Sequence, residues 1–481
     1  MPNYINPQDK AYLEFTRERK ALWDRIAAKK AKKIRWSSYY HRQLQSTYRF
    51  LIPAGSTVLD VGCGKGDLLA SLQPSEGVGV DFSEAMIAAA QEAHPECRFV
   101  CADAHTLPDL GKSFDFIILS DLVNDVWDVQ TILMQLRSFC TPRTRLVINF
   151  YNRLWEFPLK VAQALHMATP LLDQNWLTQQ DMRNLLQLCD YEVVHTSSEV
   201  LLPFFFPLMS GLFNRVLARL WLFKWLCMTN LLVARPRGRV REAEPSVSVV
   251  IAARNEAGNI PQIFARVPEL GSQTELIFVE GHSTDHTYEM IEKAAAQSSR
   301  PVQLLKQEGK GKGDAIRLGF QHAKGDVLMI LDADLTVPPE DLPRFYEALV
   351  SNRGEFINGV RLVYPMQKEA MRFFNTLGNK FFSTAFSWLL GQSIKDTLCG
   401  TKVLWREDYE KIAANRAFFG DFDPFGDFDL IFGAAKLNLK IVDLPIRYRE
   451  RTYGETNIQR WKHGVLLFRM LWVAAVRLKF V

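Results

Sequence analysis

The sequence predicts an α/β protein of two domains. In both halves, short apolar or β-branched runs alternate with helical segments, the pattern of a mostly parallel sheet covered by helices. The chain has 481 residues, more than one hydrophobic core usually supports. A segment rich in Arg, Pro, Gly and Glu, ARPRGRVREAEPS (234–246), interrupts the alternation. We therefore predict one domain over 1–234, a linker over 235–246 and a second domain over 247–481.

Composition and charge place the chain among ordinary globular proteins. Apolar residues make up 48% and charged residues 23%, and the formal net charge is +5. A charge this small and diffuse does not indicate a nucleic-acid-binding protein, and no basic stripe with interleaved aromatic residues follows the motifs below. The 7 cysteines lack the spacing of a disulfide framework or zinc finger, which favours a reducing compartment. The polar N-terminus lacks a signal-peptide core, so we expect a cytoplasmic protein.

The N-terminal part, 8–50, has a helical pattern. It contains the basic run KKAKK (29–33) and the aromatic cluster WSSYY (36–40). We prefer a solvated face for these lysines over a membrane-binding or substrate-binding arm, because most charge runs lie on solvated faces.

Two other segments are unusually apolar, 201–228 and 464–481. Arg and Lys interrupt both before about twenty apolar residues accumulate, so neither is predicted to span a membrane. In the first, Arg215, Arg219 and Lys224 recur at near-helical spacing among Leu, Phe and Trp. Two interpretations remain open: an interfacial helix that holds the protein peripherally at the inner face of the cell membrane, or a helix packed on its own domain with its cations extended into water.

The first candidate site lies at four strand ends. The run VLDV contains Asp60 and leads into three glycines at alternate positions, where glycine lets the backbone turn and approach a ligand closely. About twenty residues later the next run ends in an acid, where a carboxylate can accept both hydroxyls of a ribose. An acid after the third run is positioned to meet an adenine amino group. These later ends are Asp81, Asp103, and Ser120 with Asp121.

These ends, with DFSEAM and CADAHTLP, resemble class I S-adenosylmethionine-dependent methyltransferases over roughly residues 35–235. The resemblance implies a Rossmann-like fold with S-adenosylmethionine as cofactor. The alternative, a doubly wound domain for a dinucleotide, is disfavoured because the turn is GxGxG and not GxGxxG. By the resemblance, the methionine part borders Asp60, Gly62 and Gly64, the ribose meets Asp81, the adenine meets Asp103 and Ala104, and Ser120 lies beside the ligand.

The acceptor side of this site is predicted after the fourth strand. Methyl transfer from a sulfonium needs proximity and, for a hydroxyl acceptor, a base. Asp121 is the candidate catalytic residue there. The next polar residues, Asn124, Asp125 and Asp128, fit acceptor-facing groups or caps of the following helix, and we prefer the capping role for Asp125 and Asp128.

The second candidate site centres on MILDADLTVPPED (329–341). A buried run delivers Asp332 and Asp334 to one side of its end, because alternate residues of a strand share a side. Two carboxylates there can hold a hard divalent cation, Mg or Mn, which bridges diphosphate oxygens and neutralises charge on a departing nucleoside diphosphate. The alternative is that both acids cap the helix that follows.

Five ordered blocks resemble family 2 glycosyltransferases with the GT-A fold, most closely the dolichyl-phosphate mannosyltransferase-like branch, over about 247–457. The blocks are VSVVIAARNEAGNI, ELIFVEGHSTDHT, GKGKGDAIRLGFQHAKGD, LDADLTVPPEDL and DTLCGTKVLWRED. The resemblance implies a nucleotide-sugar donor and a glycan, glycolipid or polyprenyl-phosphate acceptor. It implies that the donor lies against Arg254, Asn255, Glu256, Glu280, Asp285, Lys312 and Asp332, and that Asp332 and Asp334 bind Mg or Mn.

The chain departs from this family pattern twice. The motif usually written Asp-Asp-x-Ser-x-Asp is EGHSTD here, and the late Gly-x-Ser-Lys motif is RTYGETNI, with Asn457 in place of the lysine. Arg451 precedes that motif and can bind a phosphate bidentately, so it is the candidate acceptor-binding residue.

Transfer with inversion needs a nucleophile opposite the leaving group. A phosphate acceptor is already ionised, whereas a sugar hydroxyl needs a base. Asp427 and Asp429, in FGDFDLIF, lie where this fold has its acceptor-side acid, so one of them is the candidate catalytic base; helix capping is an equal alternative.

The leading hypothesis is a bifunctional cytoplasmic transferase, which joins a methyltransferase to a nucleotide-sugar glycosyltransferase in cell-surface polysaccharide or glycolipid synthesis. The alternative is a glycosyltransferase whose methyltransferase-like half is a non-catalytic scaffold or a membrane adaptor acting through 201–228.

Overall fold

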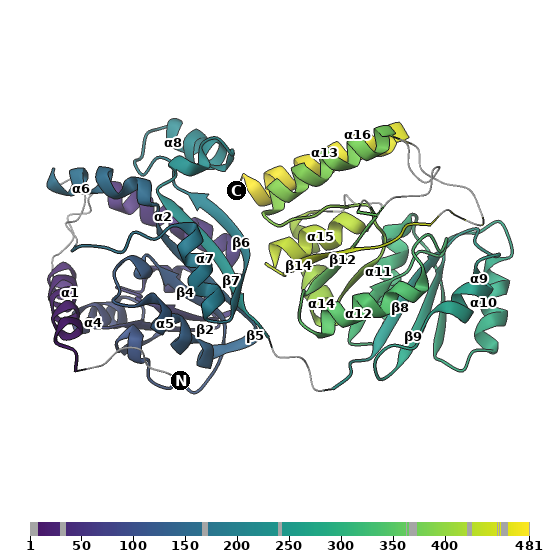
Figure 1. The fold of residues 1–481 in the computed structure, drawn as a ribbon, viewed down its shortest axis with the longest axis horizontal. Helices are drawn as coiled ribbons and strands as arrows, with labels where there is room; N and C mark the ends of the chain where they lie inside the picture. Colours follow the sequence, from purple (N-terminus) through teal and green to yellow (C-terminus); the bar gives the residue numbers. More distant parts are fainter. Residues whose placement is uncertain are drawn as a thin grey trace. The chain divides into compact units, whose positions relative to one another are not determined.

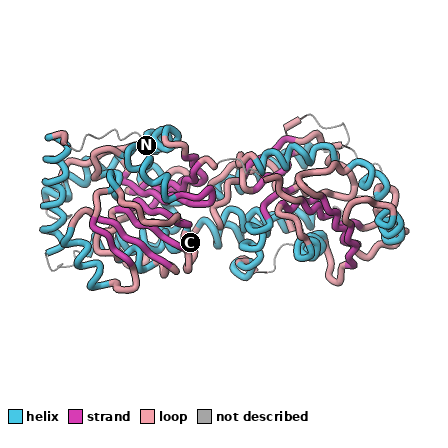
Figure 2. The backbone as a smooth tube through the Cα atoms, turned by 90° about the horizontal axis from the view of Figure 1, so that it is seen from below, coloured by secondary structure: helices cyan, strands magenta, loops and turns pink. Residues whose placement is uncertain are grey.

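The structure, a computed structural model, divides the chain into two compact units. Unit 1 is Met1–Gly238 with the last two residues, and unit 2 is Arg239–Lys479. Each unit contains one seven-stranded sheet between helices (Figure 1, Figure 2), which confirms the two-domain α/β prediction. The residues that the structure describes are 8–28, 35–165, 172–238, 243–361, 363–364, 373–420, 426–449, 451, 453 and 460–480.

The sheet of unit 1 has the strand order β3-β2-β1-β4-β5-β7-β6. Its strands are parallel except β7, which runs antiparallel to both neighbours. The order reverses between β1 and β4, and open α/β sheets bind ligands at the carboxyl ends of the strands beside such a switch point. The strands are β1 Thr57–Val61, β2 Glu76–Asp81, β3 Arg98–Cys101, β4 Phe114–Ser120, β5 Cys140–Tyr151, β6 Tyr191–Glu199 and β7 Thr229–Pro236.

Helices cover both faces of this sheet because its central strands are apolar on both sides. Val58 and Leu59 of β1 are each fully buried, yet they belong to separate apolar clusters. Leu59 clusters with residues of α5 and α7, and Val58 with residues of α2, α3 and α4. The helices are α1 Lys10–Ala28, α2 Arg35–Leu51, α3 Asp67–Ser71, α4 Glu84–Ala93, α5 Val129–Leu136, α6 Glu156–Ala164, α7 Gln179–Leu188 and the single turn α8 Met209–Gly211.

The sheet of unit 2 has the strand order β10-β9-β8-β11-β13-β12-β14. Strand β13 is antiparallel to both of its neighbours, and the other pairs are parallel. Here the order reverses between β8 and β11, so their carboxyl ends flank a second switch point. The strands are β8 Val247–Ala253, β9 Thr274–Glu280, β10 Val302–Lys306, β11 Val327–Ile330, β12 Phe356–Val360, β13 Lys402–Trp405 and β14 Ile441–Pro445.

Two apolar clusters also sandwich the second sheet. Val250 of β8 clusters with residues of α11, α13, α15 and α16, and its neighbour Val249 clusters with residues of α9, α10 and α12. The helices are α9 Ile260–Arg266, α10 Thr287–Ala296, α11 Lys312–His322, α12 Leu342–Val350, α13 Phe373–Leu390, α14 Arg406–Ala414, α15 Asp427–Lys436 and α16 Arg460–Ala474.

The prediction of one helix within 201–228 is wrong. The segment folds as short turns, with α8 followed by a π turn at Leu212–Val216 and 3-10 turns at Leu217–Arg219 and Lys224–Leu226. Local polar contacts take the place of the regular backbone hydrogen bonds of a helix. The Asn214 side chain bonds both the N–H and the carbonyl of Leu202 at 2.8 Å, and two prolines interrupt the segment near its start.

The other apolar segment is helical. Helix α16 packs on α13 through Phe468, whose ring centroid lies 5.2 Å from that of Phe382. Within the described residues, no helix combines the length and apolar character needed to cross a membrane. Strand β7 extends to Pro236, two residues into the predicted linker. The run KKAKK (29–33) and Asn457 lie outside the described residues.

Two helical glycines of unit 2 give a matched test of this packing. A Cβ on Gly319 of α11 would lie 2.3 Å from Cγ1 of buried Val250, whereas one on Gly378 of α13 would have open space. Overpacking costs about 1–3 kcal/mol, more than the helix propensity that alanine gains over glycine. We expect Gly319→Ala to lower the free energy of unfolding of unit 2 by on the order of 1 kcal/mol and Gly378→Ala to raise it by up to about 1 kcal/mol, measured by denaturant unfolding. Equal effects would contradict the packing of α11 on β8.

Candidate functional site

Asp60 of β1 is the most buried acid at the switch point of unit 1. Its side chain is 1% exposed, and its Oδ1 has no hydrogen-bond partner among the described residues. Burial, and then the charge of Asp81, raise the pKa of Asp60 to about 7. A buried carboxyl with an unsatisfied oxygen is unfavourable unless a polar or cationic group meets it. The ammonium or sulfonium group of S-adenosylmethionine has the chemistry to fill this role.

The glycine turn after β1 leaves room for a ligand. Gly62 and Gly64 have φ of +78° and +52°, left-handed values that side chains rarely adopt, and a Cβ on Gly64 would meet nothing within 4 Å. Asp81, at the end of β2, anchors this turn because its carboxylate accepts the N–H of Gly64 at 3.0 Å and that of Ser83 at 2.9 Å. The structure therefore brings the predicted glycines and Asp81 together beside Asp60.

The carboxylate of Asp103 already has partners. It accepts the Tyr12 hydroxyl at 2.7 Å and the backbone N–H of His105 at 2.9 Å, and the His105 ring Nδ1 lies 2.7 Å away. Asp103 thus caps the 3-10 turn Ala104–Thr106. An adenine ring at this position would share Asp103 with the phenol of Tyr12.

Helix α1 lies over the carboxyl edge of the sheet, a role that the sequence analysis missed. Besides the bond from Tyr12, Asp24 bonds the hydroxyl of Ser83 at 2.5 Å and Lys20 pairs with Glu84 at 2.8 Å. These contacts join α1 to the segments that follow β2 and β3. The available sequence signal was the spacing of Tyr12, Arg19 and Trp23, which lie on one side of a helix.

Asp125 and Asp128, both predicted as caps, have different roles. Asp128 caps α5 by accepting the N–H of Gln130 at 3.0 Å, which confirms the prediction. For Asp125 the prediction is wrong, because its carboxylate accepts from Arg19 at 2.9 Å and from the indole N–H of Trp23 at 2.8 Å. Its charge therefore anchors α1.

Asp121 lies just after Ser120, the last residue of β4, in a buried polar cluster. Its Oδ1 accepts the Tyr40 hydroxyl at 2.9 Å and the amide of Asn149 at 2.5 Å. Burial raises the pKa of Asp121 to about 7 despite both bonds. The Tyr40 ring lies 6.1 Å from that of Tyr151. A carboxyl that titrates near neutral pH beside aromatic rings has the chemistry of a general base.

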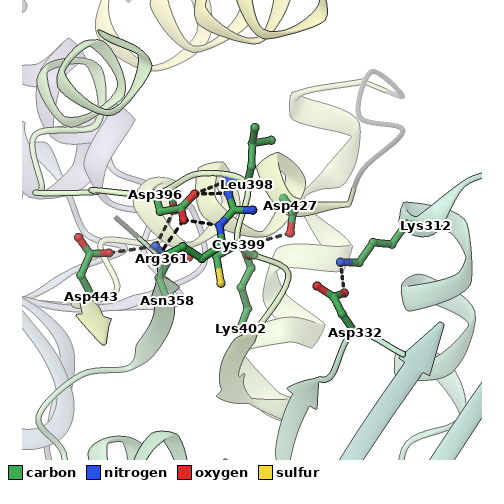
Figure 3. Close-up of polar contacts among 10 residues, drawn as sticks. All are labelled: Lys312, Asp332, Asn358, Arg361, Asp396, Leu398, Cys399, Lys402, Asp427 and Asp443. Carbon is green, nitrogen blue, oxygen red and sulfur yellow. Dashed lines mark hydrogen bonds and ion pairs between the residues drawn. The ribbon is translucent and has the colours of Figure 1, made fainter. Parts of the chain in front are cut away.

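The edge of unit 2 centres on an ion pair between Asp332, which follows β11, and Lys312, the first residue of α11 (Figure 3). Burial alone would raise the pKa of Asp332, but the Lys312 ammonium holds it below its ordinary value. Burial would likewise lower the pKa of Lys312, but the charges of Asp332 and Asp427 raise it. This arrangement keeps one positive and one negative group at the switch point.

Asp334 forms the other half of the predicted acidic pair. Its Oδ1 accepts the N–H of Thr336 at 3.1 Å, and its Oδ2 accepts Nη2 of Arg451 at 2.8 Å. Nη1 of Arg451 lies 3.5 Å from Glu256. Burial raises the pKa of Glu256 to about 7, although Arg451 and Asn259 oppose the shift. Arg451, the candidate acceptor-binding residue, therefore bridges Asp334, predicted as a metal ligand, and Glu256, predicted to contact the donor.

The remaining residues assigned to the donor follow the ends of β8 and β9. Arg254, directly after β8, is exposed, and Asn255 accepts the N–H of Thr284 at 2.8 Å. Glu280 ends β9 and accepts the N–H of Ser283 at 2.5 Å. Asp285 accepts the N–H of Ala257 at 3.3 Å. These bonds connect the two strand ends and bring the predicted residues to one edge of the sheet.

The carboxylates of Asp332 and Asp334 fit a Mg²⁺- or Mn²⁺-type ion. Such ions take oxygen ligands, typically one or two carboxylates and the phosphates of a substrate. Lys312 and Arg451 pair with these same carboxylates, so the edge already accommodates positive charge. In the part of the chain that the structure describes, no group of three or more His, Cys, Asp or Glu is arranged to hold a metal. The two carboxylates therefore suit an ion that the diphosphate of a substrate helps to bind.

Asp427 and Asp429 point to different partners. Asp427 pairs with fully buried Lys402 at 2.7 Å, and its charge acts on Lys312 (Figure 3). Asp429 pairs instead with Arg416 at 2.7 Å and lies 3.5 Å from Arg317. Neither acid is the N-cap residue of α15, because that position is Gly426. Of the two, Asp427 is the one near the Lys312–Asp332 pair.

A further buried ion pair in unit 2 was missed. Arg361, directly after β12, forms a bidentate pair with Asp396 at 2.7 and 2.8 Å (Figure 3). Asp396 also accepts the N–H of Leu398 at 3.0 Å, which fixes the loop that leads to Lys402. Asp396 opens the block DTLCG, but nothing in the local sequence marks Arg361 as its partner.

Two family models match the chain. A model described as a methyltransferase domain matches residues 58–143, and one described as glycosyl transferase family 2 matches residues 248–413. With the strand orders above, the units have the class I methyltransferase fold and the GT-A fold, respectively.

Curated relatives match the second unit. The undecaprenyl-phosphate 4-deoxy-4-formamido-L-arabinose transferase of Edwardsiella ictaluri is 28% identical over 46% of this chain and 63% of its own length. The dolichol-phosphate mannosyltransferase of Pyrococcus furiosus is 30% identical over 44% of this chain and 59% of its own length. The chain thus spans less than two thirds of these two relatives.

Solved structures resemble each unit at low identity. Glucosyl-3-phosphoglycerate synthase from Mycobacterium tuberculosis, solved with Mn²⁺ and UDP, has a TM-score of 0.36 and 19% identity, and covers 49% of this chain and 80% of its own. An S-adenosylmethionine-dependent methyltransferase from Mesorhizobium loti has a TM-score of 0.31 and 21% identity, and covers 40% of this chain and 96% of its own.

The raised pKa of Asp60 predicts a pH-dependent stability. Between the ordinary pKa of 3.8 and the folded value of about 7, the folded protein retains a proton that the unfolded chain releases. Stability is therefore lost as pH rises through this window. We expect Asp60→Asn, which cannot ionise, to raise the thermal unfolding midpoint of unit 1 more at pH 8 than at pH 5. Asp67→Asn, at a side chain that is 71% exposed, is the control. An equal shift at both pH values would refute the buried state of Asp60.

Proposed function

We propose that this chain, which carries a methyltransferase domain and a family 2 glycosyltransferase domain, is a bifunctional transferase with two live sites. One observation carries the proposal: in each unit an acid lies beside the switch point of the sheet, buried Asp60 in unit 1 and partly buried Asp332 in unit 2. Burying a carboxyl is unfavourable without a partner. Oδ1 of Asp60 has none among the described residues, whereas Asp332 pairs with Lys312. The proposed reactions are methyl transfer from S-adenosylmethionine in unit 1 and inverting glycosyl transfer from a nucleotide-sugar in unit 2.

The proposed acceptor of unit 2 is a polyprenyl phosphate. The names of the two relatives, an undecaprenyl-phosphate and a dolichol-phosphate sugar transferase, support this class. Arg451 supports it chemically, because a guanidinium binds phosphate bidentately. Such an acceptor resides in a membrane, so the enzyme would work in the cytoplasm, peripherally at the inner membrane face, in polysaccharide or glycolipid synthesis.

In the proposed glycosyl transfer, the acceptor oxygen bonds to the anomeric carbon on the face opposite the departing diphosphate. Lys312, at the start of α11, is positioned to meet the charge that develops on the diphosphate. A Mg or Mn ion held by Asp332 and Asp334 would neutralise part of the same charge. An ionised phosphate acceptor needs no base. For a sugar hydroxyl, we propose Asp427, since it is the one of the two candidate acids that lies near the Lys312–Asp332 pair (Figure 3).

In the proposed methyl transfer, Asp81 meets the ribose hydroxyls and Asp60 the charged methionine end of the cofactor. Asp103 and Ala104 border the adenine, with Tyr12 as an additional contact. Asp121 accepts the proton of a hydroxyl acceptor, and its pKa of about 7 suits a base at neutral pH.

The second candidate function is a glycosyltransferase whose unit 1 is a non-catalytic scaffold. The bond from Tyr12 to Asp103 favours it, because it occupies the carboxylate expected to meet adenine. Cofactor binding separates the two functions: a scaffold does not bind S-adenosylmethionine.

Glycosyl transfer is tested with the full chain, a radiolabelled nucleotide-sugar panel, Mn²⁺ and undecaprenyl phosphate. We expect Asp334→Asn to lower kcat/KM by on the order of 10²-fold, because it removes charge stabilisation of the leaving group. The variant is expected to retain methyl transfer. Binding of S-adenosylmethionine is the readout if no methyl acceptor has been identified. Asp341→Asn is the matched control, at an acid that pairs with half-exposed Arg344 at 3.2 Å. Full activity of Asp334→Asn would eliminate the proposed metal site.

The methyltransferase site is tested by titrating S-adenosylhomocysteine into Asp81→Lys. We expect binding to weaken by at least about tenfold, because a charge-assisted bond to ribose is worth about 1.5–3 kcal/mol. Asp109→Lys, at an exposed acid before β4, is the control and is expected to bind normally. Unchanged binding by Asp81→Lys in a folded protein would disprove the ribose assignment.

A further inference from the structure

Unit 1 exposes large apolar side chains on two segments, α6 and the turns at 205–226. The apolar surface is defined here by Phe157, Leu165, Leu208, Trp221, Leu222 and Trp225, whose exposed fractions are 76%, 63%, 95%, 67%, 60% and 66%. Single exposed apolar residues are ordinary, but a contiguous group of this kind marks an interaction site.

Side-chain hydrogen bonds from residues just before α6 hold the two segments together. The Asn152 amide donates to the carbonyl of Trp225 at 2.9 Å, and the Trp155 indole donates to the carbonyl of Leu226 at 2.9 Å. Both segments lie at the same end of unit 1 (Figure 1). The exposed side chains therefore project from two segments that these hydrogen bonds join.

Local hydrogen bonds also fix the conformation of the turns at 205–226. The hydroxyl of buried Ser210 accepts the N–H of Phe206 at 2.6 Å and donates to the carbonyl of Phe204 at 2.9 Å. Cys227, directly after the last turn, is fully buried. Ser210 and Cys227 thus face inward while the Trp and Leu side chains of this segment face solvent, although folding alone favours burial of such apolar side chains.

The charges around the apolar surface indicate which kind of partner it binds. The segment 201–228 contains no Asp or Glu, whereas Arg215 and Lys224 are both exposed. The Lys224 ammonium lies 5.5 Å from the Trp225 ring centroid. Exposed Trp and Leu mixed with cations match the interface of a bilayer with anionic headgroups, where indole rings lie at headgroup level and cations meet phosphate.

We propose that unit 1 docks on an anionic phospholipid bilayer through the apolar surface. The proposal rests on the membrane-borne acceptor of the proposed function and extends it to the methyl transfer. Tyr151 immediately precedes Asn152, whose amide bonds the carbonyl of Trp225, and the Tyr151 ring lies 6.1 Å from Tyr40, which bonds Asp121. The acceptor side of unit 1 is therefore adjacent to the docking surface, and the methyl acceptor is a lipid-linked molecule.

Flotation of the full chain with vesicles tests the docking. The vesicles are phosphatidylcholine, with or without phosphatidylglycerol. We expect flotation with the anionic vesicles, weakened by added salt, and weaker flotation with the neutral ones. Absence of binding to either kind, or equal binding to both, would overturn the proposal. The assay needs no substrate, so its outcome is independent of whether either transfer reaction occurs.

A matched pair of variants identifies the surface. Leu222→Ser removes a side chain of the apolar surface, and Leu188→Ser removes one of similar exposure, 68%, at the end of α7. We expect Leu222→Ser to lower the partition coefficient by about tenfold and Leu188→Ser to leave it unchanged. Equal effects would overturn the assignment of the surface. Thermal unfolding of both variants checks that unit 1 remains folded.

The same surface has two other potential occupants, a second copy of the chain and a protein partner. Light scattering without vesicles distinguishes the first: a dimer that Trp221→Ser dissociates would overturn the membrane proposal. The charge-reversing substitutions Arg215→Glu and Lys224→Glu test the second occupant, a protein partner. These substitutions are expected to abolish the preference for anionic vesicles, and a retained preference would contradict the role of the cations.

Discussion

A carboxylate that is buried at the end of a parallel strand needs a positive or hydrogen-bonding partner, and this constraint organises both units. In unit 2 the partner of Asp332 belongs to the protein, because Lys312 pairs with it. In unit 1, Oδ1 of Asp60 lacks one among the described residues, and its pKa is raised to about 7. The sheet topology delivers both acids to switch points, so the same architecture produces one charge-balanced edge and one edge suited to a cationic ligand.

The edges differ in how the chain covers them. In unit 1, α1 bonds to segments that follow three different strands, through Tyr12, Asp24 and Arg19. A cofactor bound beneath α1 would therefore be shielded from water, which strengthens the electrostatic interactions of Asp60 and Asp81. In unit 2, Arg451 performs the closest equivalent role by joining Asp334 to Glu256. Because Arg451 is a charged and partly exposed side chain, it can exchange these contacts for contacts to a phosphate ligand.

Local sequence patterns predicted the fold and the strand-end residues, because a strand that ends in an acid or glycine needs only neighbouring residues to be recognised. They did not predict partners distant in the chain. Asp125 appeared to be a cap because its partner, Arg19, is 106 residues away. Asp427 and Asp429 were indistinguishable by sequence, since Lys402 and Arg416 decide which faces the ion pair. The segment 201–228 had helical spacing, yet Asn214 and the prolines favour turns.

The central claim, that one chain holds two ligand sites, is tested most directly by calorimetric titration of the full-length protein. The ligands are S-adenosylmethionine and a panel of UDP-, GDP- and dTDP-sugars, with and without Mn²⁺. The account predicts that S-adenosylmethionine binds without metal and that one sugar nucleotide binds with metal, each independently of the other. Failure of S-adenosylmethionine to bind, while a sugar nucleotide binds, would contradict the bifunctional claim and leave unit 1 as a scaffold.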